Sequence, residues 1–527
     1  MSESNPGQRQ RSGAPVFILD EDSERTAGRD AQQANIAAGK AIAEAVRTTL
    51  GPQGMDKMLV SDSGDVVITN DGATILSEMD IEHPAAQMLV DVADEQEAAL
   101  GDGTTTAAIL TGELLSAAEE FLDQDLHPRT IVEGYWEVER IAADAIDDCI
   151  LDDDEFGEES LQQAVESAMT GKGTGSVAVD ALAGTIIEAV ERVDDDGTAD
   201  RDAIAVEART GRSASATEVV DGVLADADPV RDGMPERVDD ATVAVIDGDL
   251  EQREPGVDTE YAISTDEQLS TAVAAEEETL VGYAESLATA GVDVAFVTGD
   301  IADRTASALA SRGILAFEDV DGDAAAVAAA TGASQVPGAD EVEAGDPGSA
   351  GAIAVEAAGD DSVVRIEAGA GEPRATVVVR GSTEHALDEI ERTVNDGIDV
   401  AVAAYNRREV VPGGGMVEVA VAERLREAAA GVEGRRQLAV EAAAEAFDAV
   451  PRALARSAGE DPIDTLVELR AANREGRAGL VIDGDVTVAD PVEHGVLDPA
   501  AVKRESVRSA VEVATMILRI DDVISAD

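Results

Sequence analysis

A helical pattern opens at the stretch Gly101-Asp102-Gly103-Thr104-Thr105-Thr106, which combines two glycines, one carboxylate and three hydroxyls. The glycines allow a tight backbone turn that can approach a bulky anion. The threonines add hydroxyl donors beside the free N–H groups and the positive dipole end of a helix. Downstream, apolar residues recur at helical spacing: Leu110, Leu114, Leu115, Ala118, Phe121 and Leu122. The pattern predicts a phosphate site at a helix N-terminus.

Asp102 lies inside this expected phosphate cradle. A carboxylate repels a phosphate unless a divalent cation lies between them, so Asp102 is predicted to be a ligand of a phosphate-bound Mg²⁺. The alternative is an ordinary turn followed by a threonine-capped helix. The six residues alone leave both interpretations open.

The charge of the chain is strongly acidic. Its 527 residues include 111 Asp and Glu against 38 Lys and Arg, which gives a net charge of −73. The acidic residues are spread through every region, and such a surface repels itself unless salt screens it. At molar salt the screening length falls to about 3 Å. We therefore expect a protein adapted to multimolar salt, and the composition excludes nucleic-acid binding through a basic patch.

The sequence also predicts a cytoplasmic protein. The single Cys149 allows no internal disulfide and fits a reducing compartment. No stretch approaches the length of a membrane span, and the polar segment 1–15 lacks the apolar core of a signal peptide. Four histidines and one cysteine cannot form a common zinc site. We expect no membrane partner.

The texture of the sequence changes along the chain. The first 150 residues are mostly helical, apart from an expected hairpin formed by 58–60 and 66–69. From about Ala203 to Val379, strand-like runs alternate with alanine-rich helices, and helical patterns return beyond Glu384. This order favours an α/β region inserted into a helical domain. It is equally compatible with three domains in series.

Six motifs occur in a diagnostic order: 50–52 (LGP), 54–59 (GMDKML), 68–75 (ITNDGATI), 101–106 (GDGTTT), 411–415 (VPGGG) and 516–522 (MILRIDD). With these motifs the chain resembles the group II chaperonins, specifically archaeal thermosome subunits of the haloarchaeal type, over roughly residues 14–525. The resemblance implies a multi-domain α+β chaperonin fold. That fold has a mostly helical equatorial domain, a small intermediate domain, and an α/β apical domain with a helical protrusion that serves as a lid.

The resemblance further implies how the chain is divided and what it does. The expected ranges are equatorial 1–154, intermediate 155–224, apical 225–375, intermediate 376–408 and equatorial 409–527. Family members hydrolyse ATP with Mg²⁺, stack as double rings of identical or sister subunits, and enclose unfolded polypeptide. The implied function is therefore that of an ATPase whose hydrolysis closes the lid over a folding client.

The resemblance assigns the phosphate and sugar contacts residue by residue. Gly51, Pro52, Gly103 and the threonines Thr104, Thr105 and Thr106 match segments around the phosphates, with Asp102 as the magnesium ligand. Gly414 matches a glycine against the ribose and base. Asp498 matches an acid at the ribose hydroxyls, although Asp-Pro pairs also begin helices routinely.

Two catalytic carboxylates are also implied by the resemblance. Asp71 matches a carboxylate near the terminal phosphate, and Asp396 matches the one that orients and deprotonates the attacking water. In its segment, Leu387, Ile390, Val394 and Ile398 mark the buried stripe, and Asp396 lies off it. The residues alone would thus make Asp396 one more solvated acid.

Lys172 matches a loop lysine that senses the terminal phosphate. The chain has four lysines (Lys40, Lys57, Lys172 and Lys503) among 38 basic residues, so an ammonium at this position is notable. A compact charge on a flexible stem suits a sensor that reaches and withdraws, whereas arginine suits a fixed clamp. The alternative is an exposed lysine without a role.

Two departures from the family pattern keep other functions open. Residues 95–100 (EQEAAL) lack the usual acidic pair, which motivates a slow-turnover structural or regulatory ring subunit as an alternative. The expected apical stretch 254–287 has few large apolar residues for binding clients. A third hypothesis, independent of the resemblance, is a metabolite kinase or synthetase that uses the same phosphate loop.

Overall fold

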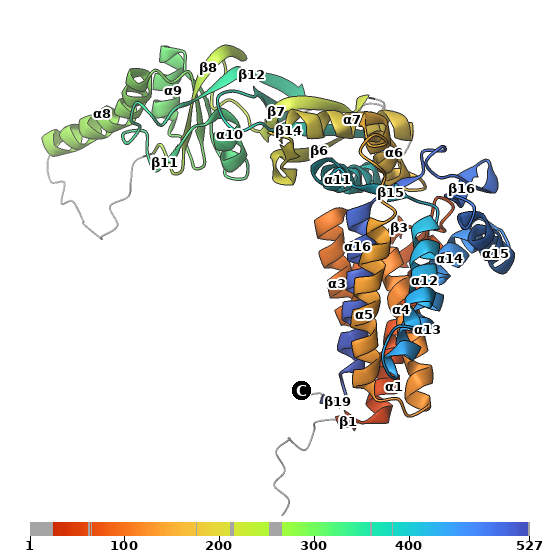
Figure 1. The fold of residues 1–527 in the computed structure, drawn as a ribbon. Helices are drawn as coiled ribbons and strands as arrows, with labels where there is room; N and C mark the ends of the chain where they lie inside the picture. The colour runs from red at the N-terminus through yellow and green to blue at the C-terminus, as the bar shows by residue number, and fades with distance from the viewer. Residues whose placement is uncertain are drawn as a thin grey trace, which may run out of the picture.

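One end of the molecule is a bundle of long helices drawn from both halves of the chain (Figure 1). The computed structural model describes residues 25–61, 64, 66–174, 177–210, 216–251, 266–358, 361–381 and 383–524. The long helices of this helical bundle share one hydrophobic core: α1 (Arg29–Val46), α3 (Pro84–Leu100), α4 (Thr104–Asp123), α5 (Pro128–Asp147), α12 (Met416–Ala429), α13 (Arg436–Phe447) and α16 (Ala500–Leu518).

Helix α16 brings the C-terminal part of the chain into this core. It packs against α3, α4 and α5, and its buried residues include Val507, Val511 and Ile517. At the far end of the bundle, β1 (Arg25–Ala27) pairs antiparallel with β19 (Asp522–Ile524). The two chain ends therefore complete one helical unit, and the α/β region is inserted into it. The alternative interpretation of the sequence, three domains in series, is therefore wrong.

Short elements surround the end of the bundle that faces the rest of the molecule. The expected hairpin is present as β2 (Lys57–Val60) and β3 (Val66–Thr69), and η1 (Arg47–Thr49) and α2 (Gly72–Ser77) flank it. The C-terminal part adds further elements here: α14 (Ala449–Ser457), α15 (Pro462–Asn473), β15 (Val410–Pro412), β18 (Leu497–Pro499), β16 (Gly479–Asp483) and β17 (Asp485–Ala489).

A middle region joins the helical bundle to the distant sheet. Its core packs α6 (Glu158–Met169), α7 (Val179–Arg192) and the long helix α11 (Glu384–Arg407) against two parallel strands, β6 (Ile204–Thr210) and β14 (Ala375–Gly381). Smaller elements complete it: β4 (Asp194–Asp195), β5 (Thr198–Ala199) and η2 (Arg201–Ala203). The region is thus built from two separate stretches of chain.

The distant α/β part, the sheet region, has its own core. Its strands continue from the middle region as one mixed sheet, in the order β10-β9-β8-β12-β13-β7-β14-β6, with β11 beside β8. These strands are β7 (Glu218–Asp226), β8 (Arg237–Ile246), β9 (Val294–Val297), β10 (Leu315–Phe317), β11 (Gln335–Val336), β12 (Gly348–Ala358) and β13 (Asp361–Glu367). Helices α8 (Asp266–Ala290), α9 (Asp303–Arg312) and α10 (Ala324–Thr331) accompany the sheet (Figure 1).

The architecture is the multi-domain α+β fold expected from the sequence. Residues 252–265, which include the beginning of the expected apical stretch 254–287, lie outside the described residues, and α8 is the described helix that follows them. None of the helices in the described part combines the length and apolar character that crossing a membrane requires.

Candidate active site

A pocket of about 430 Å³ lies between the phosphate-loop end of the helical bundle and the middle region. Its wall includes every predicted site residue except Asp396: Gly51, Pro52, Asp71, Asp102, Gly103, Thr104, Thr105, Thr106, Lys172, Gly414 and Asp498. These residues come from stretches of chain that are far apart in sequence. The fold therefore brings the sequence-predicted positions to one place.

The predicted phosphate loop begins helix α4 inside this pocket. Gly103 is the N-cap residue with φ +89°, and no side chain caps the helix, so the first backbone N–H groups keep their donors for a ligand. Gly101 has φ +63°, and a Cβ there would stand 2.8 Å from the Cα of Asp396. Only glycine fits this backbone at this distance from α11.

Gln96 and Ser506 fix the loop from behind. The buried Gln96 Nε2 donates to the Asp102 carbonyl at 3.0 Å and to Ser506 Oγ at 2.9 Å. The Ser506 hydroxyl lies 3.2 Å from the Gly103 carbonyl oxygen, to which it can donate. The segment that departs from the family pattern thus still supplies a residue that holds the phosphate loop.

The Asp102 carboxyl is suited to a cation. Burial raises its pKa, and the nearby Lys172 and Lys503 oppose that rise. A carboxylate that loses hydration in this way gains most from a positive partner. The free N–H groups of α4 beside it and the oxygen donor itself match what a phosphate-bound Mg²⁺ requires.

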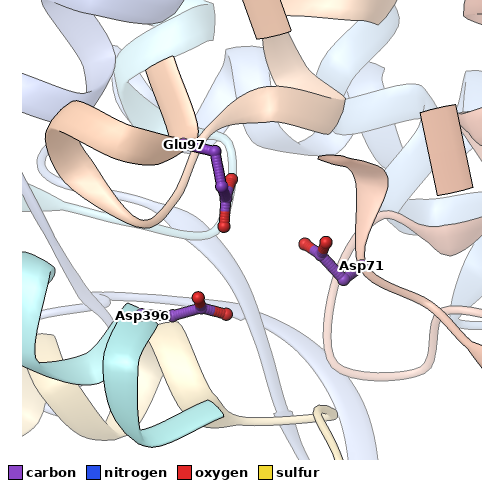
Figure 2. A group of neighbouring side chains, drawn as sticks. All are labelled: Asp71, Glu97 and Asp396. Atoms are coloured by element: carbon purple, nitrogen blue, oxygen red, sulfur yellow. The ribbon is translucent and has the colours of Figure 1, made fainter. Parts of the chain in front are cut away.

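Three carboxyl groups converge at the edge of the pocket (Figure 2). Oxygens of Asp71, Glu97 and Asp396 all lie within 4.8 Å of one another. Asp71 is the N-cap of α2, where its side chain accepts a hydrogen bond from the Thr74 N–H at 2.7 Å. Glu97 comes from the last turn of α3, and Asp396 comes from α11.

The crowding of these acids changes their protonation. Burial, together with Asp71 and Asp396, raises the pKa of Glu97 to about 9. Burial also raises the pKa of Asp396 to about 6, and Lys172 opposes this rise. The Thr104 hydroxyl donates to Glu97 Oε2 at 2.6 Å. Glu97 therefore keeps its proton at neutral pH and links the acidic cluster to the phosphate loop.

Lys172 lies between the acidic cluster and the pocket. Its Nζ is 2.7 Å from Asp396 Oδ2, and the two side chains are 17% and 15% exposed. Burial lowers the pKa of Lys172, but Asp396 and the other carboxylates outweigh it, so the pKa is raised. Both alternatives from the sequence, an exposed lysine and a solvated aspartate, are wrong.

The backbone of the Lys172 loop contacts the short segments at the end of the helical bundle. Asn70 Nδ2 donates to the Gly171 carbonyl at 2.7 Å. A Cβ on Gly171 would stand 2.8 Å from the Cα of Pro52. Movement of this loop would therefore change its contact with the Gly51-Pro52 turn.

Gly414 and Asp498 lie at another part of the pocket wall. Gly414 has φ +62°, and a Cβ there would stand 2.4 Å from the Leu480 carbonyl oxygen. Asp498 pairs with Lys503 at 2.7 Å, and Lys503 also pairs with Glu418 at 2.9 Å.

Sequence reasoning missed Glu97, Glu418 and Lys503. The signal for Lys503 was available, because the scarcity of lysine that singled out Lys172 applies equally to it. Glu97 stands one helical turn before Gly101, which could have directed attention to it. Nothing in the sequence distinguishes Glu418 from the many other acids.

Comparison with known proteins agrees with this arrangement. The model of the TCP-1/cpn60 chaperonin family matches residues 42–527. Thermosome subunit 3 of Haloferax volcanii is 56% identical over 520 residues, covering 97% of this chain and 98% of the relative. Thermosome subunit alpha of Halobacterium salinarum is 44% identical, covering 98% and 92%. That of Archaeoglobus fulgidus is 46% identical, covering 98% and 95%.

The chain therefore belongs to the TCP-1/cpn60 chaperonin family, as a group II chaperonin of the thermosome type. It is an ATP-dependent chaperonin subunit, and its enzymatic activity is ATP hydrolysis coupled to protein folding. The metabolite kinase or synthetase hypothesis is wrong, and the slow-turnover ring subunit is not favoured.

Proposed function

We propose that the pocket binds ATP with Mg²⁺ and that its hydrolysis closes a lid over unfolded polypeptide. The observation that carries this proposal is the convergence of the predicted residues on one pocket, with Asp396 paired to Lys172 at its edge. The volume, about 430 Å³, is in the range of small-molecule sites.

Asp102 would hold the magnesium ion, and the N–H groups and hydroxyls of Thr104, Thr105 and Thr106 would hold the phosphates. A bound Mg²⁺ would supply positive charge that offsets the phosphates and polarises the bond to be broken. Gly51 and Pro52 would close the other side of the phosphate site, with Gly414 and Asp498 at the sugar.

Asp396 would orient the attacking water and accept its proton, and Asp71 would lie near the terminal phosphate. Their convergence with Glu97 supports this role, because a water placed among the three could bond to more than one carboxyl oxygen. The raised pKa of Asp396, about 6, makes it a better base than an ordinary aspartate while leaving it largely ionised at neutral pH.

Lys172 would report the terminal phosphate to the rest of the subunit. Its loop follows α6 in the middle region and touches the helical bundle at Pro52. We propose the division equatorial 1–154 and 409–527, intermediate 155–224 and 376–408, and apical 225–375. In that division Lys172 and Asp396 both belong to the intermediate domain, while Asp71, Asp102 and Asp498 are equatorial.

The assembly we propose is a double ring of identical or sister subunits in the cytosol of a cell with multimolar salt. The hairpin β2–β3 supports a subunit contact, since Met58, Val60 and Ile68 are at least half exposed. Two relatives, thermosome subunits 1 and 3, come from the single organism Haloferax volcanii, which supports sister subunits.

Steady-state ATPase assays in molar KCl, with and without Mg²⁺ and an unfolded protein, test the proposal. We expect Mg²⁺-dependent phosphate release and recovery of the client in native form only when ATP is hydrolysed. ATP hydrolysis without any client refolding would instead favour the structural ring subunit.

A further inference from the structure

Lys503 has no role in the function proposed above, although it is one of the two lysines in the pocket wall. It lies in the first turn of α16, and its side chain is 13% exposed. All but four of the 38 basic residues of this chain are arginines. A lysine in the pocket wall of this arginine-rich chain therefore indicates a position that requires a compact ammonium and is not suited to a planar guanidinium.

One ammonium bridges two carboxylates here. Lys503 Nζ lies 2.7 Å from Asp498 Oδ2 and 2.9 Å from Glu418 Oε1. The three residues come from α16, β18 and the first turn of α12. Gly413 closes the space behind Asp498, since a Cβ there would stand 3.2 Å from Oδ2. The bridge therefore ties three separate segments of the pocket wall together.

Glu418 anchors the bridge. Its side chain is 4% exposed, and its Oε2 has no hydrogen-bond partner among the described residues. Among the described residues, Lys503 is the cation that pairs with the buried Glu418 carboxylate. Because an unpaired buried charge is costly, Lys503 is held at Glu418 whatever occupies the pocket.

Asp498 is the exposed end of the bridge. Its side chain is 20% exposed and lines the pocket. With Oδ2 held by the ammonium, Oδ1 is left as an acceptor in a fixed orientation. A fixed acceptor favours a ligand that places a hydrogen-bond donor at that point. A ligand without the donor leaves the acceptor unpaired and therefore binds more weakly.

We propose that Lys503, anchored by Glu418, is the positioning residue that fixes Asp498 against the ribose hydroxyls and so gives the site its preference for ribonucleotides. This inference rests on the proposed function, in which Asp498 contacts the ribose. A structural ion pair would need only the buried Glu418, whereas the second contact of Lys503 reaches Asp498, the more exposed of the two carboxylates in the pocket wall.

The test is nucleotide binding measured by calorimetry in multimolar KCl with Mg²⁺. ATP, 2′-deoxy-ATP and 3′-deoxy-ATP are compared for wild type, Asp498→Ala, Lys503→Arg and the double variant Lys503→Met with Glu418→Met. The double variant removes both buried charges together, a change that proteins often tolerate. The matched control is Lys40→Met with Glu119→Met, which removes a 2.8 Å pair between α1 and α4.

In wild type we expect loss of a ribose hydroxyl to weaken binding by about 10-fold or more, as for a hydrogen bond to a charged group. The double variant should bind ATP about 10-fold more weakly and lose most of this discrimination, and Lys503→Arg should lose part of it. The control pair should keep the wild-type discrimination.

Two results would overturn the inference, and they separate it from the proposed function. If Asp498→Ala removes the discrimination but the double variant keeps it, or weakens all three nucleotides equally, Lys503 is structural only. If Asp498→Ala itself leaves the discrimination unchanged, the ribose role of Asp498 is wrong and the inference fails with it.

Discussion

Lys172 and Asp396 form an ion pair of 2.7 Å across 224 residues of sequence, at the edge of a pocket that Lys172 lines. Lys172 belongs to the loop after α6, and Asp396 belongs to α11. Helices α6 and α11 share the core of the middle region. A phosphate that attracts Lys172 competes with Asp396 for the same ammonium. In the function proposed above, this competition would couple nucleotide binding to the packing of the middle region.

The Lys172→Ala variant should still hydrolyse ATP at a measurable rate, but its lid should close poorly. A ligand shifts a conformational balance only by its differential affinity for the two states, and a lysine–phosphate contact made in one state supplies that difference. Lys172→Arg should be intermediate, because its planar group fits poorly where a compact ammonium moves. Protease protection of the sheet region with a hydrolysis transition-state mimic measures closure.

The control for that experiment is Lys40→Ala, which removes a lysine paired with Glu119 on the bundle surface. Its closure should equal that of wild type. Full protection in Lys172→Ala would show that Lys172 does not act as the sensor.

Asp102→Ala and Asp396→Ala should separate binding from chemistry. Loss of Asp102 deletes the proposed cation ligand, so the affinity for Mg·ATP should fall. Loss of Asp396 should leave that affinity nearly intact and lower single-turnover hydrolysis by about 10²–10⁴-fold, the usual effect of losing a positioned general base. Nucleotide titration and quench-flow kinetics measure the two quantities. A normal single-turnover rate in Asp396→Ala would disprove its role.

Glu97→Gln should make the subunit less sensitive to alkaline pH. The pKa of Glu97 rises from 4.5 to about 9 in the folded protein, chiefly through burial. The folded state thus keeps a proton that the unfolded chain releases, and the stability of the wild type falls as pH rises from about 4.5 towards 9. Glutamine has no proton to lose, so the Tm of the variant relative to wild type should increase over that window.

Thermal unfolding at constant KCl between pH 5 and 9 tests this expectation. Glu95→Gln is the matched control, since Glu95 is an exposed glutamate two residues earlier on the same helix. A Tm difference for Glu97→Gln that stays constant with pH would contradict the prediction.

Lowering KCl from multimolar to decimolar should dissociate the rings before or together with unfolding. With a net charge of −73, repulsion within and between subunits grows as the screening length increases from about 3 Å to about 10 Å. Light scattering and negative-stain images along a salt series measure the assembly. Intact, active rings in dilute buffer would refute the idea.

The local elements were largely predictable from sequence. The phosphate loop and helix α4, the hairpin β2–β3 and the strands around 243–246 and 376–379 follow from period, glycine and turn residues. These signals are confined to a few neighbouring residues. They sufficed to propose Asp102 as a ligand of a phosphate-bound Mg²⁺.

The partners of the buried charges were not predictable in the same way. In a chain with 111 acidic residues, helical position alone could not mark Asp396, because its partner Lys172 lies in a distant loop. The same holds for Glu418, whose ion-pair partner Lys503 lies 85 residues away in sequence. Long-range pairing of charges is a property of the fold, and the periodicity of apolar residues in the sequence does not reveal it.

The division of the helical bundle between the two chain ends imposes an order on biosynthesis. Helices α1, α3, α4 and α5 leave the ribosome first, yet α16, which packs against all four of them, is made last. At roughly 5–20 residues per second, their apolar faces wait on the order of tens of seconds for this partner. The sheet region, a continuous stretch between them, can finish folding during that delay. A nascent subunit is therefore itself an aggregation-prone chain of the kind that chaperonins exist to shelter.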